Sequence, residues 1–178
     1  MLSSERHLPH WYAIAQPLFI TFRLHGSLPS GREFPPESLT SGEAFLCMDR
    51  LLDNARVGPT YLAKSPIAQI VVDSLQHCGQ TDYWLHAWVV MPNHVHMLAT
   101  PRTDVSRFMR RLKGYTARQA NRLLTRTGQT FWQEESYDHL VRTAEESRRI
   151  EGYILNNPVK AGLAPTPEDY RWSSAHIA

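Results

Sequence analysis

The sequence contains only two cysteines, Cys47 and Cys78, and no apolar run as long as the ~20 residues that a membrane helix requires. The two thiols lack a close metal-binding spacing, and the first residues do not resemble a secretion signal. Internal repeats and low-complexity stretches are also missing, which argues against a repeat protein. We therefore expect reduced cysteines in a cytoplasmic protein with no transmembrane segment.

The length favours a single domain. A chain of 178 residues can bury roughly two-thirds of the surface that it exposes when unfolded. We expect one domain over residues 1–178 that folds without disulfides. Its last part, from about residue 159 to residue 178, contains Pro165, Pro167 and Trp172, so we expect an irregular tail that docks on the domain.

Positive charge is concentrated in one segment, although the formal net charge is only +2. Residues 101–130 carry eight lysines and arginines against one acidic residue, whereas the segments before and after carry more acidic than basic side chains. A solvated helix face explains such a segment at least as often as a function does. The same pattern is expected of a surface that contacts phosphates.

Hydrophobic periodicity predicts a mixture of strands and helices. Strands are expected in the second half of 13–29, at 82–90 and 94–101, and within 131–142; helices are expected at 41–56, 65–80, 104–126 and 143–158. Met91-Pro92-Asn93 suits a tight antiparallel connection. Because the elements do not follow a regular parallel crossover pattern, we expect an α+β sandwich with a mostly antiparallel sheet and helices packed on it.

Capping residues mark the helix ends. Asp104 is placed to cap the helix at 104–126, and Thr143 with Glu146 forms a capping box at the start of the last helix. Asn156-Asn157-Pro158 is expected to halt that helix, because the residue before a proline avoids the helical conformation.

His94 and His96 form the most informative pair. Alternate side chains of a strand point to the same face, so both imidazoles would project together while Val95 points into the core. Two imidazoles on one face can hold a divalent metal ion. The alternative, a core histidine beside an unrelated one, is the commoner outcome for such a pair taken alone.

The helix at 104–126 offers a third ligand and a nucleophile. Its helical projection places Tyr115 and Gln119 one turn apart, at the seam between the apolar stripe and the basic face. A metal ion held by His94, His96 and Gln119 would polarise a phosphodiester, and Tyr115 would attack it to form a phosphotyrosine. A boundary tyrosine and a solvated glutamine are the alternatives for the two helix residues.

Further side chains are expected to contact DNA. Basic residues of the helix would follow backbone phosphates, an indole would stack on a base, and residues near the last helix end would contact base edges or phosphates. For the indole a core position is the alternative, and for the asparagine a helix cap. The expected DNA contacts are Arg107, Arg110, Arg111, Lys113, Arg118, Arg122, Trp132, Asn157 and Lys160.

Four segments together resemble a known family. MPNHVHML, LKGYTARQANR, FWQEESYDHLVR and YILNNPVKAGL followed by DYRWSS occur in this order. In this order and with these separations they resemble the REP-associated tyrosine transposases, a branch of the single-tyrosine HUH transposases. The resemblance covers most of the chain, from the strand around Phe19 to Ser174.

The resemblance implies a ferredoxin-like α+β core in which the histidine pair binds Mg²⁺ or Mn²⁺. It implies that the helix tyrosine, carried onto Tyr115, attacks single-stranded DNA to give a 5′-phosphotyrosine and a free 3′-hydroxyl, with Gln119 as the third ligand. Substrates in this family are hairpin-forming repeated palindromes with a single-stranded flank. We therefore expect a bacterial, nucleoid-associated DNA nicking and rejoining enzyme, monomeric or homodimeric, without a membrane partner or a small-molecule substrate.

Two other functions are compatible with these residues. A domesticated, non-catalytic protein would bind hairpins in a salt-sensitive manner and leave them uncut. A zinc hydrolase acting on small molecules would use His94 and His96 as ligands. The sequence disfavours the hydrolase, because no further His, Cys or acidic residue follows the pair at a short fixed spacing.

Overall fold

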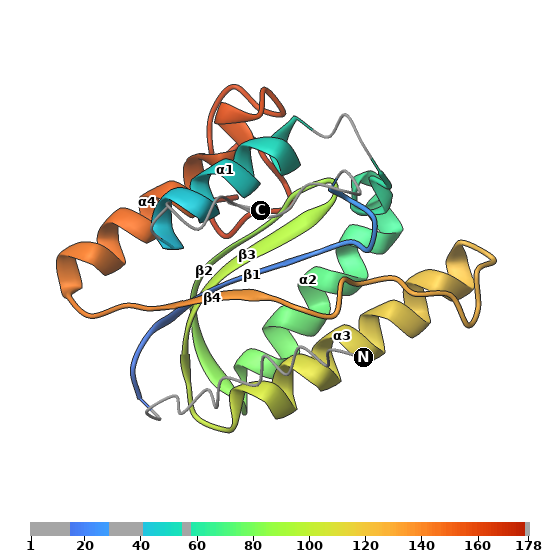
Figure 1. The fold of residues 1–178 in the computed structure, drawn as a ribbon, viewed down its shortest axis with the longest axis horizontal. Coiled ribbons are helices and arrows are strands. Elements are labelled where there is room, and N and C mark those ends of the chain that lie inside the picture. The colour runs from blue at the N-terminus through green and yellow to red at the C-terminus, as the bar shows by residue number, and fades with distance from the viewer. Residues whose placement is uncertain (1–14, 29–40, 55–57, 177–178) are drawn as a thin grey trace, which may run out of the picture.

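The computed structural model describes residues 15–28, 41–54 and 58–176, without the side chains of residues 41–45. One sheet carries helices on both of its faces (Figure 1). The elements are β1 (Leu18–Arg23), α1 (Ser41–Asp53), the 3₁₀ turn η1 (Tyr61–Ala63), α2 (Ser65–Gly79), β2 (Tyr83–Val90), β3 (His94–Pro101), α3 (Val105–Leu123), β4 (Tyr137–Leu140) and α4 (Ala144–Lys160).

The four strands form one antiparallel sheet in the order β2-β3-β1-β4. Met91–Asn93 connects β2 to β3, as predicted. The succession β1-α2-β2-β3-α3-β4 with this strand order is the ferredoxin-like arrangement, so the expected fold class is confirmed. α1 is inserted between β1 and α2, and α4 follows β4.

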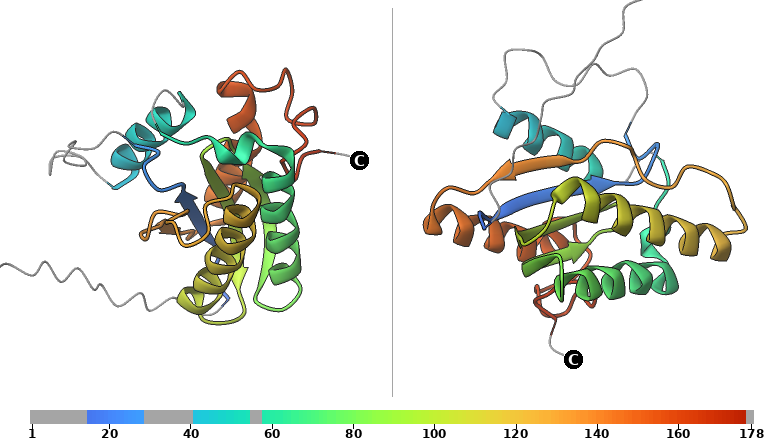
Figure 2. Two further views of the ribbon diagram at one scale, coloured as in Figure 1. Left: turned by 90° about the vertical axis from the view of Figure 1, so that its right-hand side faces the viewer. Right: turned by 90° about the horizontal axis from the view of Figure 1, so that it is seen from below.

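The two faces of the sheet carry different layers (Figures 1 and 2). α2 and α3 cover one face, where Ile20 and Met97 belong to the larger apolar cluster. α4 covers the opposite face, where Phe19 and Leu98 pack with Ile154, and α1 lies on the same side of the sheet as α4. We call these the α2/α3 face and the α1/α4 face.

Both predicted helix caps are present, but α4 ends later than expected. The Asp104 carboxylate accepts the backbone N–H of Arg107, and the Thr143 hydroxyl accepts that of Glu146. Pro158 lies inside α4, which continues to Lys160, so the predicted stop before this proline is wrong. Because Pro158 falls in the last turn, its missing N–H removes a single helical bond near an end. The predicted end of α1 at Arg56 lies outside the described residues.

The chain touches itself at Gly26 and Gly58, which lie on either side of α1 in the sequence. Both glycines adopt the left-handed conformation, with φ of 76° and 82°, which L side chains rarely adopt. A Cβ on Gly58 would overlap the Gly26 carbonyl group. Glycine at both positions therefore lets the backbone that leaves the sheet contact the backbone that returns.

The C-terminal tail runs along the outer edge of β2. The Val90 N–H donates to the Trp172 carbonyl at 2.8 Å, and the Ser174 N–H donates to the Trp88 carbonyl at 2.9 Å. The Tyr170 hydroxyl donates to the Val90 carbonyl at 3.0 Å. The tail thus satisfies backbone groups that an edge strand would otherwise expose. Across the described ranges, no helix combines the length and apolarity needed to cross a bilayer.

Candidate active site

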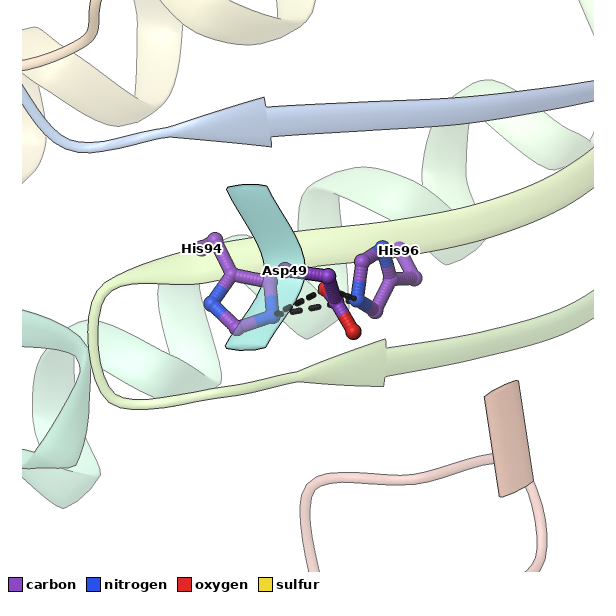
Figure 3. Close-up of side chains that lie close together, drawn as sticks. All are labelled: Asp49, His94 and His96. Atoms are coloured by element: carbon purple, nitrogen blue, oxygen red, sulfur yellow. Dashed lines mark hydrogen bonds and ion pairs between the residues drawn. The ribbon is translucent and has the colours of Figure 1, made fainter. Parts of the chain in front are cut away.

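His94 and His96 project from β3 toward the α1/α4 face (Figure 3). Val95, between them, belongs to the cluster on the other face, as strand alternation requires. Both imidazoles are fully buried. Their Nε2 atoms lie 3.0 Å apart and their ring centroids 4.6 Å apart, so one pair of nitrogens converges on a single point.

Hydrogen bonds at the opposite ring nitrogens fix both imidazoles. His94 Nδ1 lies 2.7 Å from Asn93 Oδ1, and His96 Nδ1 lies 2.7 Å from Thr21 Oγ1. The Asn93 amide is held in turn by its N–H donation to the Leu52 carbonyl at 2.9 Å. A ring that donates its Nδ1–H to an oxygen keeps the Nε2 lone pair for a ligand, which is the usual arrangement of metal-binding histidines.

Asp49, from α1, completes the cluster. Its Oδ1 atom lies 2.9 Å from His96 Nε2 and 3.7 Å from His94 Nε2. Ligand atoms of these three residues all lie within 4.8 Å of one another, and all three residues are buried. Two imidazole nitrogens and a carboxylate oxygen form a donor set that suits a divalent cation.

The titration of these groups favours cation binding. Burial, together with the neighbouring His96, lowers the pKa of His94 to about 3. Burial alone would raise the pKa of Asp49, but the hydrogen bond with His96 and the charges of both imidazoles lower it to about 2. At neutral pH the cluster therefore presents a neutral His94 imidazole and an ionised carboxylate, which are the forms that bind metals.

Asp53 lies one turn further along α1. Its Oδ1 atom is 3.9 Å from His94 Nε2. Burial and the nearby charge of Asp49 raise the pKa of Asp53 to about 7, against a lowering effect of Lys160. Asp53 is therefore about half protonated at neutral pH, and a positive charge bound beside it would favour its ionised form.

α4 contributes a tyrosine and an asparagine to the same place. The Tyr153 hydroxyl donates to Asp49 Oδ2, and its ring lies 5.7 Å from the His96 ring. Asn157, one turn on, is fully buried and its Nδ2 lies 3.4 Å from Asp49 Oδ2. Its Oδ1 atom has no hydrogen-bond partner among the described residues. A buried, unbonded amide oxygen beside two imidazoles and a carboxylate fits a further ligand of a bound cation.

Lys160 lies close to this tyrosine. Its Nζ atom is 4.6 Å from the centroid of the Tyr153 ring, a cation–π distance. Burial and the charge of Asp49 raise the pKa of Tyr153 above its ordinary value, so the hydroxyl is a hydrogen-bond donor at neutral pH. Nearby positive charge, from Lys160 or a bound cation, favours the phenolate instead.

The structure does not bring Tyr115 and Gln119 to the histidines. α3 packs on the α2/α3 face through side chains such as Leu112, and Tyr115 is 47 % exposed beside α2, where it lines a cavity with His77. Gln119 follows one turn later on the same helix. The sheet therefore separates both residues from the imidazoles. The helical projection located the seam of this helix, but it contains no information about which sheet face the helix covers.

The basic side chains of α3 share its position away from the cluster. Arg107, Arg110, Arg118 and Arg122 are exposed. Two others have structural partners: Arg111 forms an ion pair with Asp82, and Lys113 Nζ donates to the carbonyls of Gln133 and Glu134 at 2.7 and 2.8 Å. Lys113 therefore holds the segment before β4 against α3.

The remaining expected DNA contacts have different environments. Trp132 is 5 % exposed and its indole N–H donates to the Thr116 hydroxyl at 2.9 Å, so it serves as a core anchor in this structure. Asn157 is buried in the cluster described above. Lys160 is exposed at the end of α4 and stays accessible to a phosphate.

Three residues of the cluster, Asp49, Tyr153 and Asn157, were not assigned to it by sequence reasoning. Asp49 lies about 60° from Leu52 on the helical projection, so a carboxylate beside an apolar stripe was the available signal. Tyr153 and Asn157 are four residues apart, which places them on one helix face. No local pattern indicates that α1 and α4 meet over β3.

Comparisons with known proteins agree with this fold. Residues 66–157 match the family model described as Transposase IS200 like. This segment includes both histidines, Tyr153 and Asn157, but it begins after Asp49. The acidic residue of the cluster therefore comes from a part of the chain outside the family match.

Curated relatives are similar over part of their length. The chain is 30 % identical over 96 residues to the REP-associated tyrosine transposase of Escherichia coli (strain K12), covering 52 % of this chain and 54 % of the relative. It is 26 % identical over 113 residues to a relative from Haemophilus influenzae named as a REP-associated tyrosine transposase, with 57 % and 64 % covered. The chain thus spans less than two-thirds of the length of either relative.

A solved structure shares the fold. It is described as the REP-associated tyrosine transposase bound to a REP hairpin, and it superimposes with a TM-score of 0.63 at 20 % identity, covering 96 % of this chain and 82 % of that one. At this identity the likeness establishes the architecture alone. Since the family model matches just over half of the 178 residues, the chain belongs to the IS200-like transposase family.

Proposed function

We propose that this protein is a metal-dependent endonuclease and strand transferase that cuts single-stranded DNA beside a hairpin through a covalent tyrosine intermediate, with Tyr153 as the nucleophile. The observation that carries the proposal is the contact of the Tyr153 hydroxyl with Asp49, whose other carboxylate oxygen lies 2.9 Å from His96 Nε2. A nucleophile and a cation-binding cluster thus share one carboxylate. Among the described residues, no carboxylate forms a hydrogen bond with the Tyr115 hydroxyl.

The bond changes follow from this arrangement. The Tyr153 oxygen attacks the phosphorus of a phosphodiester, and the bond from phosphorus to the 3′-oxygen breaks. The tyrosine is left with a 5′-phosphate ester, and the departing strand ends in a 3′-hydroxyl. The proton lost by Tyr153 is balanced by the proton gained by the 3′-oxygen. Attack of a 3′-hydroxyl on the phosphotyrosine reverses the step and rejoins a strand.

The side chains of the cluster have separate roles in this step. Asp49 Oδ2 accepts the tyrosine hydroxyl and orients the oxygen for attack, while Lys160 favours the phenolate over the phenol. His94, His96, Asp49 and Asn157 would hold a divalent cation such as Mg²⁺ or Mn²⁺. A cation bound there would polarise the phosphodiester and offset the charge that grows on its oxygens.

The first test is formation of a covalent adduct. The purified protein is incubated with Mn²⁺ and labelled hairpin oligonucleotides carrying a single-stranded flank, starting with repeat hairpins from the genome that encodes it. We expect a protein–DNA band that survives denaturing electrophoresis. Tyr153→Phe should abolish this band, whereas Tyr115→Phe should leave it.

The matched pair of variants makes the outcomes distinct. If Tyr115→Phe loses the adduct and Tyr153→Phe keeps it, the assignment of Tyr153 is wrong. An adduct that survives both substitutions would exclude either tyrosine as the nucleophile. Hairpin binding without any adduct under Mg²⁺ or Mn²⁺ would point to a non-catalytic DNA-binding protein, the alternative raised by the sequence.

A further inference from the structure

A cavity of about 300 Å³ opens beside the cluster, between β1, α1 and the segment before β4. Thr21, Arg23, Met48 and Tyr137 are among the residues that line it. We infer that this cavity binds one unpaired nucleotide next to the phosphate that is cut, with Arg23 on its phosphate and the Tyr137 ring against its base. The inference rests on the proposed DNA-cleaving function and names a subsite of it.

The sheet register connects the cavity to the cluster. Arg23 is opposite His94 and Thr21 is opposite His96 in the β1–β3 pairing, and Tyr137 is opposite Thr21 in the β1–β4 pairing. Directly opposed residues of antiparallel strands project to the same face. Tyr137, Thr21 and His96 therefore form one row across the α1/α4 face. Tyr137 also contacts Phe19 edge-on at 6.3 Å, and Phe19 in turn contacts the rings of His96 and Tyr153.

Arg23 is suited to bind a phosphate in this cavity. Its side chain is partly buried, and within the described part of the chain it makes one hydrogen bond, a long donation from Nη1 to the Ser27 hydroxyl at 3.4 Å. Among the described residues, no carboxylate lies within 4.0 Å of its guanidinium, although Glu135 also lines the cavity and its charge acts on Arg23 from further away. A guanidinium has five N–H donors and pairs with phosphate oxygens in a bidentate manner. Most of its donor capacity is therefore available to a ligand.

The volume of the cavity and the residues that line it limit which ligand it can bind. A cavity near 300 Å³ lies at the small end of ligand sites, so it admits a nucleotide but not a stacked duplex. An aromatic ring on one side and a guanidinium on another match the two parts of a nucleotide, a base with a π-face and a charged phosphate. The wall is shared with the cluster through Thr21, which bonds His96 at 2.7 Å. Such a nucleotide therefore lies beside the scissile phosphate.

The test measures binding in a protein that cannot cut. Tyr153→Phe protein is titrated into a labelled hairpin oligonucleotide, and into two copies of it that lack the base on one or the other side of the cut position. If no cut is found, a short oligothymidylate with and without a central abasic site serves as the probe. We expect one abasic probe to bind roughly 5- to 100-fold more weakly than the intact probe.

Second substitutions in the same background identify the side chains involved. With Tyr137→Leu, the intact and abasic probes should bind equally, whereas Tyr137→Phe should keep the discrimination. Arg23→Gln should weaken binding and lower the slope of log affinity against log salt by about 1. Arg171→Gln is the matched control and should leave the slope unchanged, because Arg171 stacks on Trp172 within the tail, at the opposite edge of the sheet.

The outcomes separate this inference from the proposed function. Discrimination that persists in Tyr137→Leu, or an unchanged salt slope in Arg23→Gln, overturns the subsite even where wild-type protein forms the adduct. Loss of discrimination in Tyr137→Leu without any wild-type adduct would support the subsite in a protein that binds DNA but does not cut it.

Discussion

At the scale of single residues, the cluster depends on hydrogen bonds that fix each imidazole. Thr21 holds His96 and Asn93 holds His94 from the side away from Asp49. Strand alternation was sufficient to place both histidines on one face, because that property is local. The contribution of Asp49 was not predictable in this way, since it depends on how α1 lies over the sheet.

We expect Thr21→Val to weaken Mn²⁺ binding by roughly 10- to 100-fold, because His96 loses the partner that orients it. Calorimetric titration of the purified protein with Mn²⁺ measures this. Thr100→Val is a matched control, since Thr100 also bonds a histidine, His86, at 2.7 Å, but outside the cluster. Equal Mn²⁺ affinity in the two variants would contradict an orienting role for Thr21.

At the scale of elements, α4 carries the proposed nucleophile and its start is fixed by a network of caps. Glu146 accepts the Arg142 N–H at 2.8 Å and bonds His139 Nε2 at 2.8 Å. The Thr143 cap on the Glu146 N–H was predictable from the spacing of the two residues, whereas the Glu146 carboxylate accepts the N–H of Arg142 and not that of the cap residue expected in a capping box. The continuation of the helix through Pro158 was not, because a proline is tolerated or excluded according to its distance from the helix end.

The hydrogen bond from the Arg142 backbone, and then the bond with His139, lower the pKa of Glu146 below its ordinary value. A carboxyl group with a depressed folded-state pKa stabilises the fold above the unfolded-state pKa, and that stabilisation is lost as the pH falls through the folded-state pKa. We therefore expect Glu146→Gln to lower the free energy of unfolding by about 0.5–1 kcal/mol at pH 7 and by progressively less in acid.

Urea denaturation over a series of pH values below 7 measures this dependence. Glu145→Gln is the control, because Glu145 lies in the same first turn of α4 but, unlike Glu146, makes no capping bond among the described residues. If Glu146→Gln still lowers the free energy of unfolding at pH values where the wild-type carboxyl group is protonated, the pKa shift of Glu146 is not the cause of that loss.

At the scale of the whole molecule, the sheet divides two layers with different roles. The α1/α4 face carries the cluster, whereas the α2/α3 face carries the larger apolar core and the exposed arginines of α3. The order of elements was sufficient to predict an antiparallel α+β sandwich. It was not sufficient to assign each helix to a face, and Tyr115 was paired with the histidines for that reason.

The tail closes the β2 edge, so its removal should affect both stability and association. We expect deletion of residues 166–178 to lower the melting temperature and to produce concentration-dependent self-association, because Trp88 and Val90 lose backbone partners on an edge strand. Thermal unfolding and light scattering measure the two effects.

Tyr170→Phe is the milder control, because it removes one hydrogen bond to the Val90 carbonyl. It should lower the free energy of unfolding by about 0.5–1.5 kcal/mol, and the protein should stay monodisperse. An unchanged melting temperature and unchanged scattering after the deletion would contradict this role of the tail.

α1 belongs to a segment of the chain whose two ends contact each other at Gly26 and Gly58. The family match begins at residue 66, beyond that point. The imidazoles therefore lie within the matched segment, while the Asp49 carboxylate lies on a segment outside it whose two ends contact each other. Deletion of that segment would remove Asp49 from beside the imidazoles and leave the residues of all four strands in place, so the sheet and the position of the acidic side chain are set by separate parts of the chain.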